Sequence, residues 1–366
     1  MKIGILTFHR AENFGAALQV YALCEYLNSL GHSAEVIDYR TRAIEQNYDI
    51  FNPSILFSRK NILHTLRLYF KRISNYKSLY KKKKLFCEFR KKYLKLTPSL
   101  KSIDSDLGFD AYIAGSDQIW RLSITGGLDN CYFLNFPTKN NAKKIVYAAS
   151  SELSDYTSLY NCKEKLSKLL SNIHSISVRE IELKEEISKY TGKEISTCVD
   201  PTFLLSSNYY RKLATLPKVS GYILVYHLST SEHAYRLARK ISIETGKTII
   251  EIFAGDIIKF DSSTHERLNA FGPTELLGYI INADTVITTS FHGLALSTIF
   301  RKNFWVVKNS SNIRLRNLLR SVGLESRLLE NADKYKGEVA INYQDVETKN
   351  AMLIQASKDF LNKALS

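Results

Sequence analysis

The hydrophobic pattern of the first forty residues predicts a strand, a helix and a second strand. Lys2–Phe8 is a short apolar run that ends in a polar loop, residues 9–15. Over Ala16–Leu30 apolar residues recur every three to four positions, which is typical of a helix, and Gly31 stands where a glycine ends one. Ala34–Tyr39 is apolar again. The three segments predict a βαβ unit whose loop lies at the carboxyl end of the first strand, where α/β sheets bind ligands.

The alternation of strands and helices continues to about residue 205. Polar residues follow several of these strands, in the segments 115–118, 179–180 and 200–201. Because the carboxyl ends of parallel strands meet at one edge of a sheet, we expect these polar groups to gather there. The further strands are predicted over Asp110–Ala114, Ile145–Ala149, Ser175–Val178 and Ile195–Val199, and the helices over Lys163–Ile173 and from 181 to Tyr190.

A second alternating series begins after a break near residues 206–220. Its strands are predicted over Tyr222–Leu228, Thr248–Phe253, Thr285–Thr289 and Phe304–Val307, and its helices over Glu232–Thr245, Thr274–Ala283, Gly293–Phe300, Leu315–Val322 and Thr348–Leu365. We therefore predict an α/β, GT-B-like fold: two doubly wound Rossmann-like domains facing a central cleft. The expected domains are residues 1–205 and 206–345, with 346–366 as a closing C-terminal helix.

Length and charge refine this picture. A chain of 366 residues exceeds the roughly 250–300 at which a single core stops growing, which supports two domains. The net charge of +15 is concentrated between residues 59 and 95, where 14 Lys and Arg accompany one acid, Glu88. The remainder of the chain is close to neutral. The first domain therefore carries a strongly basic insertion.

Apolar residues recur at helical spacing among these basic residues, which predicts an amphipathic helix or helical hairpin. An anionic membrane surface would attract such a segment. Alternatively, the apolar stripe packs on the first domain while the charges are solvated. Nucleic-acid binding would need a recognition motif that the sequence lacks, so no nucleic-acid partner is predicted. The stripe consists of Ile62, Leu63, Leu66, Tyr69, Phe70, Ile73, Tyr76 and Tyr80.

Several classes of protein and site are excluded by motifs that the sequence does not contain. The five cysteines lie far apart without a C-x-x-C pair, which argues against zinc fingers and disulfide scaffolds and favours a reducing compartment. We expect no signal peptide and no membrane span, hence a cytoplasmic location, peripheral at the inner face of the membrane if the basic segment binds lipid. Neither a G-x-G-x-x-G nor a Walker motif is present, and no metal site is predicted.

Six short motifs occur in an order that resembles the bacterial polysaccharide pyruvyl transferase family. They are Asn13-Phe14-Gly15-Ala16-Ala17-Leu18-Gln19, Gly115-Ser116-Asp117-Gln118-Ile119-Trp120, Tyr147-Ala148-Ala149-Ser150, Ser177-Val178-Arg179-Glu180, Val199-Asp200-Pro201-Thr202 and Ser290-Phe291-His292-Gly293. The resemblance implies a GT-B enzyme that uses phosphoenolpyruvate, without a further cofactor, to form a pyruvate ketal on a sugar of a capsular or exopolysaccharide precursor. The acceptor would be a sugar or a polyprenyl-diphosphate-linked oligosaccharide. Some members have Arg-Leu-His where this chain has Ser290-Phe291-His292, which removes one candidate cation.

Ketal formation requires a proton donor and a proton acceptor, and two residues are assigned to this chemistry. His292, which can titrate near neutral pH, is the expected general acid or base. Asp117 is the expected partner base or orienting carboxylate. The alternatives are a histidine bonded to neighbouring backbone and an aspartate that stabilises its own turn.

The remaining candidates are assigned to the two substrates. Arg179 follows a buried strand and needs an anion, which is either the donor or a nearby carboxylate among Glu180, Glu182 and Asp200. For the polar residues the alternative is loop capping, for the aromatic residues a place in the core, and for Arg10 a solvated surface. The donor would contact Arg179, Ser290, Phe291 and Gly293, and the acceptor Arg10, Asn13, Ser116, Gln118 and Trp120. Glu275 is expected to interact with a helix dipole.

Two other functions fit the same architecture. One is a GT-B glycosyltransferase that uses a nucleotide-sugar donor. The other is a non-catalytic protein that binds a glycan or a lipid. Release of phosphate or of a nucleotide would separate the two enzymatic hypotheses.

Overall fold

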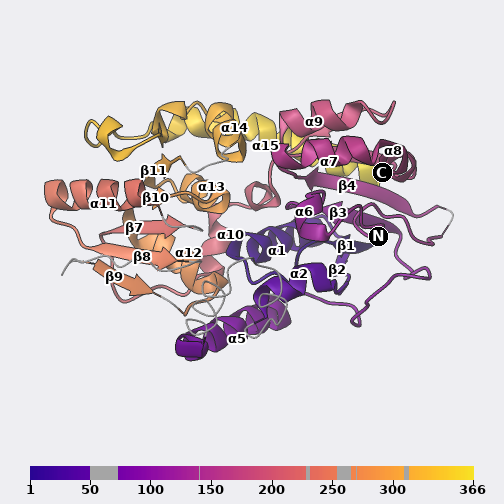
Figure 1. Cartoon of the computed structure of the whole chain (residues 1–366), viewed down its shortest axis with the longest axis horizontal. Helices are drawn as coiled ribbons and strands as arrows, with labels where there is room; N and C mark the ends of the chain where they lie inside the picture. The colour runs from indigo at the N-terminus through magenta and orange to yellow at the C-terminus, as the bar shows by residue number, and fades with distance from the viewer. Residues whose placement is uncertain (50–72, 140, 228–230, 254–264, 269, 309–312) are drawn as a thin grey trace. The chain divides into compact units, whose positions relative to one another are not determined.

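The computed structural model describes residues 1–49, 73–139, 141–227, 231–253, 265–268, 270–308 and 313–366. The chain divides into two compact units (Figure 1). Unit 1 consists of Met1–Leu204 and Ala356–Ser366, and unit 2 of Leu205–Gln355. The last helix, α15 (Tyr343–Leu365), is not a separate closing element, because it begins in unit 2 and its final residues belong to unit 1.

Unit 1 is built on a six-stranded parallel sheet in the order β2-β1-β3-β4-β5-β6. The chain passes outward from β1 to β2 and then returns to the other side of β1 as β3. The order therefore reverses between β1 and β3, which makes this position the topological switch point of the sheet. The strands are β1 (Lys2–Leu6), β2 (Ser33–Val36), β3 (Ala111–Gly115), β4 (Lys143–Ala149), β5 (Ser175–Val178) and β6 (Ile195–Thr197).

Helices cover both faces of this sheet. Val146 of β4 belongs to a core that includes Leu166 of α8 and Leu183 of α9. The next residue, Tyr147, packs against Phe360 of α15, with ring centroids 6.3 Å apart. Since successive side chains of a strand point to opposite faces, α8 and α9 lie on one face and α15 on the other. The helices of this unit are α1 (Phe14–Ser29), α2 (Arg42–Glu45), α5 (Tyr76–Tyr93), α6 (Leu122–Thr125), α7 (Tyr156–Asn161), α8 (Lys163–Ser171) and α9 (Ile181–Ser188).

The predicted basic helix is present as α5. Its Phe86 packs on Phe14 of α1 at 5.1 Å between ring centroids, and Phe89 packs on Tyr21 at 6.2 Å. Three residues of the predicted apolar stripe do not share this packing. Ile73, Tyr76 and Tyr80 are exposed, whereas Phe86 and Phe89 are buried. The other members of that stripe, Ile62, Leu63, Leu66, Tyr69 and Phe70, lie outside the described residues.

Unit 2 also contains a six-stranded parallel sheet, in the order β12-β11-β10-β7-β8-β9. Counted within the unit this is the strand order 6-5-4-1-2-3, which is the Rossmann order, and the switch point lies between β7 and β10. The strands are β7 (Tyr222–His227), β8 (Ile249–Phe253), β9 (His265–Leu268), β10 (Ala283–Thr288), β11 (Asn303–Val307) and β12 (Leu328–Leu329).

The second sheet is likewise covered on both faces. Ile223 and Val225 share a core with residues of α11. On the other face Tyr222 donates a hydrogen bond from its hydroxyl to the carbonyl of Tyr279 in α12, at 2.7 Å. The prediction of two doubly wound α/β domains is therefore confirmed, and the central cleft stays a prediction. The helices of unit 2 are α10 (Ser207–Leu213), α11 (Glu232–Thr245), α12 (Pro273–Asn282), α13 (Phe291–Ile299) and α14 (Ile313–Ser321).

Candidate active site

The loop that follows β1 lies at the switch point of unit 1. Asn13 caps α1, because its side-chain oxygen accepts a hydrogen bond from the amide of Ala16 at 3.2 Å. Arg10 donates from Nε to Oδ1 of Asp38 at 2.7 Å and from Nη2 to Oδ2. The Nε2 atom of His9 lies 2.8 Å from the same Oδ1. Arg10 is thus an ion-paired residue of this loop rather than a solvated surface cation.

Asp38 is the common partner of His9 and Arg10. Its burial opposes the charged form, but hydrogen bonds from His9 and Arg10 outweigh burial and lower the pKa of Asp38 below its ordinary value. A depressed carboxyl pKa stabilises the folded state above the unfolded pKa, and this contribution is lost as the pH falls through the folded pKa. Asp38 therefore stabilises unit 1 at neutral pH and loses this effect only in strong acid.

Replacing Asp38 by asparagine is expected to lower the free energy of unfolding at pH 7 by about 1.5–3 kcal/mol, the range for hydrogen bonds to charged groups. The difference from wild type should shrink as the pH falls below about 4, where the unfolded carboxyl becomes protonated. Urea denaturation between pH 7 and pH 2 measures it, with the exposed Glu164→Gln as the control. A deficit that is independent of pH would contradict this role.

The loop that follows β3 lies on the other side of the same switch point. Asp117 has a left-handed backbone with φ of 69°, and its Oδ1 accepts a hydrogen bond from the amide of Gln118 at 2.9 Å. The turn-stabilising alternative is therefore present in the structure. Asp117 combines a position at the switch point with a half-buried carboxylate.

The other candidates from this loop are more enclosed than expected. Ser116 is buried, and its hydroxyl donates to the carbonyl of Ala148 at 3.0 Å. Gln118 is also buried. Trp120 is 0% exposed and stacks on Phe133 at 5.1 Å, with an interplanar angle of 5°. The prediction that Trp120 offers a face to a sugar is corrected, because both faces of a core indole are unavailable to a ligand.

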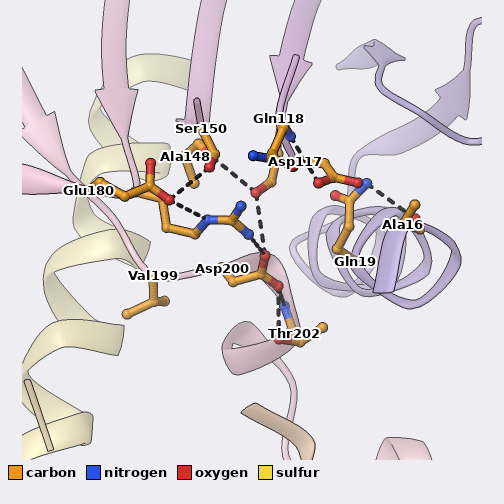
Figure 2. A network of polar contacts seen from close by, with 12 residues as sticks. Ala16, Gln19, Asp117, Gln118, Ala148, Ser150, Glu180, Val199, Asp200 and Thr202 are labelled. Carbon is orange, nitrogen blue, oxygen red and sulfur yellow. Dashed lines mark hydrogen bonds and ion pairs between the residues drawn. The ribbon is translucent and has the colours of Figure 1, made fainter. Parts of the chain in front are cut away.

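Arg179 follows β5, and its anionic partners are two carboxylates of the protein itself. Its Nη1 donates to Oδ2 of Asp200 at 2.5 Å, and its Nε donates to Oε1 of Glu180 at 3.2 Å. Ser150 donates a further hydrogen bond to Glu180 at 2.7 Å, and the amide and hydroxyl of Thr202 both donate to Asp200 (Figure 2). Burial opposes the guanidinium charge, but Glu180 and Asp200 outweigh it and raise the pKa of Arg179.

The side chains of this Arg179 network are almost completely buried, at 5% exposure for Arg179, 2% for Glu180 and 0% for Asp200. The ion-pair alternative is therefore present in the structure, and the contact of Arg179 with the donor stays a prediction. Its guanidinium is an internal ion-pair partner that fixes the loops after β5 and β6.

In unit 2 the turn between β10 and α13 holds the SFHG motif. Ser290 caps α13, because its hydroxyl accepts from the amide of Gly293 at 3.3 Å. A side chain at Gly293 would place its Cβ 2.3 Å from Oγ1 of Thr288, so glycine is required for α13 to approach the sheet. The expectation that Gly293 offers a free amide to the donor is corrected, since that amide is bonded to Ser290.

His292 stands in the first turn of α13, directly after the switch-point strand β10. It is 7% exposed, and the ring of Phe291 packs against it edge-to-face at 5.2 Å between centroids. Phe291 is itself buried. Glu275, in α12, accepts a hydrogen bond from the amide of Gly272 at 3.0 Å, which gives it the expected role at a helix N-terminus.

A buried polar cluster that was not predicted from the sequence lies at the end of β7, the strand that pairs with β10 at this switch point. His227 ends β7, and its Nε2 lies 2.8 Å from Oε1 of Glu251. Glu251 also accepts a hydrogen bond from the hydroxyl of Tyr235, and Nε of Arg267 donates to its Oε2 at 2.8 Å. Burial and the neighbouring Glu251 raise the pKa of Tyr235. The one sequence signal was an acid within the apolar strand Ile249–Phe253.

A family model described as polysaccharide pyruvyl transferase matches residues 13–311 of the chain. The chain belongs to this family. The match begins within the loop after β1 and includes all of the other loops described above. No curated protein matches the sequence.

Solved structures with a similar fold have very different sequences. UDP-GlcNAc 2-epimerase from Neisseria meningitidis, bound to UDP-GlcNAc, is 9% identical, with 100% of this chain and 94% of that chain covered and a TM-score of 0.48. The E. coli heptosyltransferase WaaC with ADP is 12% identical, with 100% of both chains covered and a TM-score of 0.38.

Among the described residues, no group of three or more His, Cys, Asp or Glu side chains is placed to hold a metal ion. In the same part of the chain, no helix has the length and apolar character needed to cross a bilayer.

Proposed function

We propose that this member of the polysaccharide pyruvyl transferase family transfers the three-carbon unit of phosphoenolpyruvate to a sugar of a capsular or exopolysaccharide precursor. The product is a cyclic pyruvate ketal across two sugar hydroxyls, and phosphate is released. The observation that carries the proposal is the placement of His292 and Asp117. Asp117 lies in the loop after β3 and His292 in the first turn of the helix after β10, each at the switch point of its own sheet, in a chain whose family is pyruvyl transferase.

The reaction balances without a further reactant. A general acid protonates the methylene carbon of phosphoenolpyruvate, which becomes the methyl group, and the first sugar hydroxyl adds to the central carbon as a base removes its proton. The bond between that carbon and the phosphate oxygen then breaks. The second hydroxyl adds to the same carbon, and its proton leaves with the phosphate. One phosphoenolpyruvate and one diol give one ketal and one hydrogen phosphate.

The proposal assigns these proton transfers to His292 and Asp117. An imidazole and a carboxylate suffice for the general acid and base, which typically contribute about 10²–10⁴ in rate. Phe291 lies next to His292 in the proposed donor site, and Asn13, Ser116 and Gln118 lie along the edge proposed for the acceptor. Ser290 and the Arg179 network hold these loops in place.

The donor is tested by incubating the protein with an acceptor glycan and either phosphoenolpyruvate or a set of nucleotide sugars. We expect acceptor-dependent release of phosphate from phosphoenolpyruvate and no release of nucleotide. Nucleotide release would instead establish a glycosyltransferase. Binding of the glycan without consumption of any donor would establish a non-catalytic protein.

We also propose that the protein works at the cytoplasmic face of an anionic membrane and binds it through α5. The outer face of α5 (Tyr76, Lys77, Tyr80, Lys81 and Lys84) is exposed and joins two aromatic rings to three cations. The rings of Tyr76 and Tyr80 stack with their centroids 6.0 Å apart. Aromatic rings at the headgroup level and lysines near anionic lipid are the two features of interfacial helices. A polyprenyl-linked acceptor is found at such a surface.

Replacing Lys77, Lys81 and Lys84 together by glutamine should weaken binding to vesicles rich in phosphatidylglycerol at least about tenfold at low salt, because each lysine contributes about 1 kcal/mol. Lys82 is left unchanged, because its ammonium lies 5.1 Å from the ring centroid of Phe14 and supports the packing of α5. Vesicle co-sedimentation at low and at high salt measures the effect.

The matched control replaces three exposed lysines of α8, namely Lys163, Lys165 and Lys168, by glutamine. Its binding should remain within about twofold of wild type. If both triple variants weaken binding equally, the attraction is a property of the net charge and not of α5. If wild type does not bind these vesicles at low salt, the membrane proposal fails.

A further inference from the structure

Arg90, near the end of α5, is a buried cation that has no counterion among the described residues. The residue is 7% exposed, and its Nη1 is fully enclosed. Among the described residues, this Nη1 atom has no hydrogen-bond partner. Burying a charged group without a partner is unfavourable by several kcal/mol. An anion from outside the chain would supply the counterion that Arg90 lacks here.

The packing of α5 explains how Arg90 reaches the ligand edge of unit 1. Phe86 and Phe89 fix the inner face of α5 on α1, and Arg90 follows Phe89 directly in the chain. Besides Cys87 of its own helix, the groups that act electrostatically on Arg90 are Arg10, Glu12 and Asp38. All three belong to the loops that follow β1 and β2, at the carboxyl ends of these strands.

The neighbouring carboxylates, Asp38 and Glu12, leave the guanidinium of Arg90 available to bind an anion. Asp38 already accepts hydrogen bonds from Arg10 and is in contact with His9, and no ion pair joins Glu12 to Arg90 within the described part of the chain. Burial and the neighbouring charge of Arg10 both lower the pKa of Arg90, as expected for two cations held close together. Bringing an oxyanion between two guanidinium groups would relieve this repulsion.

Two further features favour an anion at this place. The loop leads into α1, a helix of 16 residues whose N-terminal end carries partial positive charge. The ammonium group of Lys82 lies 5.1 Å from the ring centroid of Phe14 and 5.8 Å from that of Phe86, and it adds a second cation to the inner face of α5. Around Glu12, the cations Lys82, Lys83 and Arg90 accompany the carboxylate of Asp49.

We propose that Arg90 and Arg10 form an oxyanion subsite beyond the carboxyl end of β1, which binds a phosphate group of a substrate. The inference rests on the proposed function for the identity of this substrate. The phosphate belongs either to phosphoenolpyruvate or to the diphosphate of a carrier-linked acceptor, and the two sources share the chemistry that a pair of guanidinium groups recognises.

The test compares wild type with Arg90→Met and with Lys91→Met, an exposed lysine on the same helix. Calorimetric titration with inorganic pyrophosphate, inorganic phosphate and phosphoenolpyruvate gives the dissociation constants. We expect Arg90→Met to weaken the binding of at least one of these anions about 10–100-fold, the effect of losing hydrogen bonds to a charged group. Lys91→Met should remain within about twofold of wild type.

The probes separate the two sources of phosphate. A loss confined to pyrophosphate assigns the subsite to the acceptor, and a loss that includes phosphoenolpyruvate assigns it to the donor. Thermal unfolding without ligand supplies the second readout. Because Arg90→Met removes an uncompensated buried charge, its unfolding temperature should equal or exceed that of wild type.

Three results would overturn the inference: wild-type anion affinities in Arg90→Met, a lowered unfolding temperature with unchanged affinities, or no binding of any of the three probes by wild type. The second would identify Arg90 as a structural residue. None of these measurements uses turnover, so they are independent of the donor assay. If the protein binds pyrophosphate through Arg90 but consumes no phosphoenolpyruvate, the subsite is supported and the proposed function is contradicted.

Discussion

Replacing His292 by alanine is expected to lower the turnover of phosphoenolpyruvate at least about a hundredfold, the lower end of the range for loss of a general acid or base. His292 lies in the first turn of α13, after the strand that borders the switch point of unit 2. Residues 291–299 contain no other histidine, so no neighbouring imidazole in this helix can take over the proton transfer. The rate constant kcat, measured by phosphate release with saturating substrates, reports the loss.

Two further variants make this prediction specific. His292→Gln keeps hydrogen-bonding capacity and similar bulk but cannot titrate, so it should be as slow as the alanine variant. His32→Ala removes a histidine at the amino-terminal edge of the first sheet, just before β2, and should keep wild-type turnover. Near-normal turnover of His292→Ala, with unchanged thermal unfolding, would eliminate His292 as the acid or base.

The second large effect concerns stability. Replacing Arg179 by methionine is expected to lower the free energy of unfolding by about 3–5 kcal/mol, the range for removing one partner from a buried ion pair. The loss is this large because Glu180 and Asp200, at 2% and 0% exposure, would be left as carboxylates without their cation. Urea denaturation followed by circular dichroism measures it.

An exposed ion pair of the same unit provides the control. Arg40 and Glu45 are joined at 2.6 Å, but their side chains are 44% and 26% exposed, so Arg40→Met should lower stability by no more than about 1 kcal/mol. Adding Glu180→Gln and Asp200→Asn to Arg179→Met should restore part of the loss. If Arg179→Met keeps wild-type stability but no longer binds phosphoenolpyruvate, then Arg179 contacts the donor as the sequence first suggested.

The strands and helices of this protein are largely predictable because buried parallel strands are short apolar runs bounded by polar loops. Strand β5 and helix α11 have the bounds that the sequence predicts, Ser175–Val178 and Glu232–Thr245. Strands β9 and β12 were not predicted. Both are edge strands, and β9 has the sequence His-Glu-Arg-Leu, which contains a single apolar residue, whereas β12 has only two residues.

The location of the candidate site is more predictable than its internal contacts. The order of elements along the chain places Asp117 and His292 after strands, and the strand order then puts both loops at switch points. Which partner a side chain selects depends on residues distant in sequence. Arg179 meets an acid 21 residues away, and Trp120 packs on Phe133 in the core. Arg90 was predicted only as one charge in a basic run.

The most direct test of the account is the structure of the product formed from phosphoenolpyruvate labelled with ¹³C at the methylene carbon. We predict that nuclear magnetic resonance of the glycan will show the label as the methyl group of a pyruvate ketal, with one phosphate released for each ketal. Recovery of the label as free pyruvate, or an unlabelled glycan after phosphate release, would contradict pyruvyl transfer by this protein.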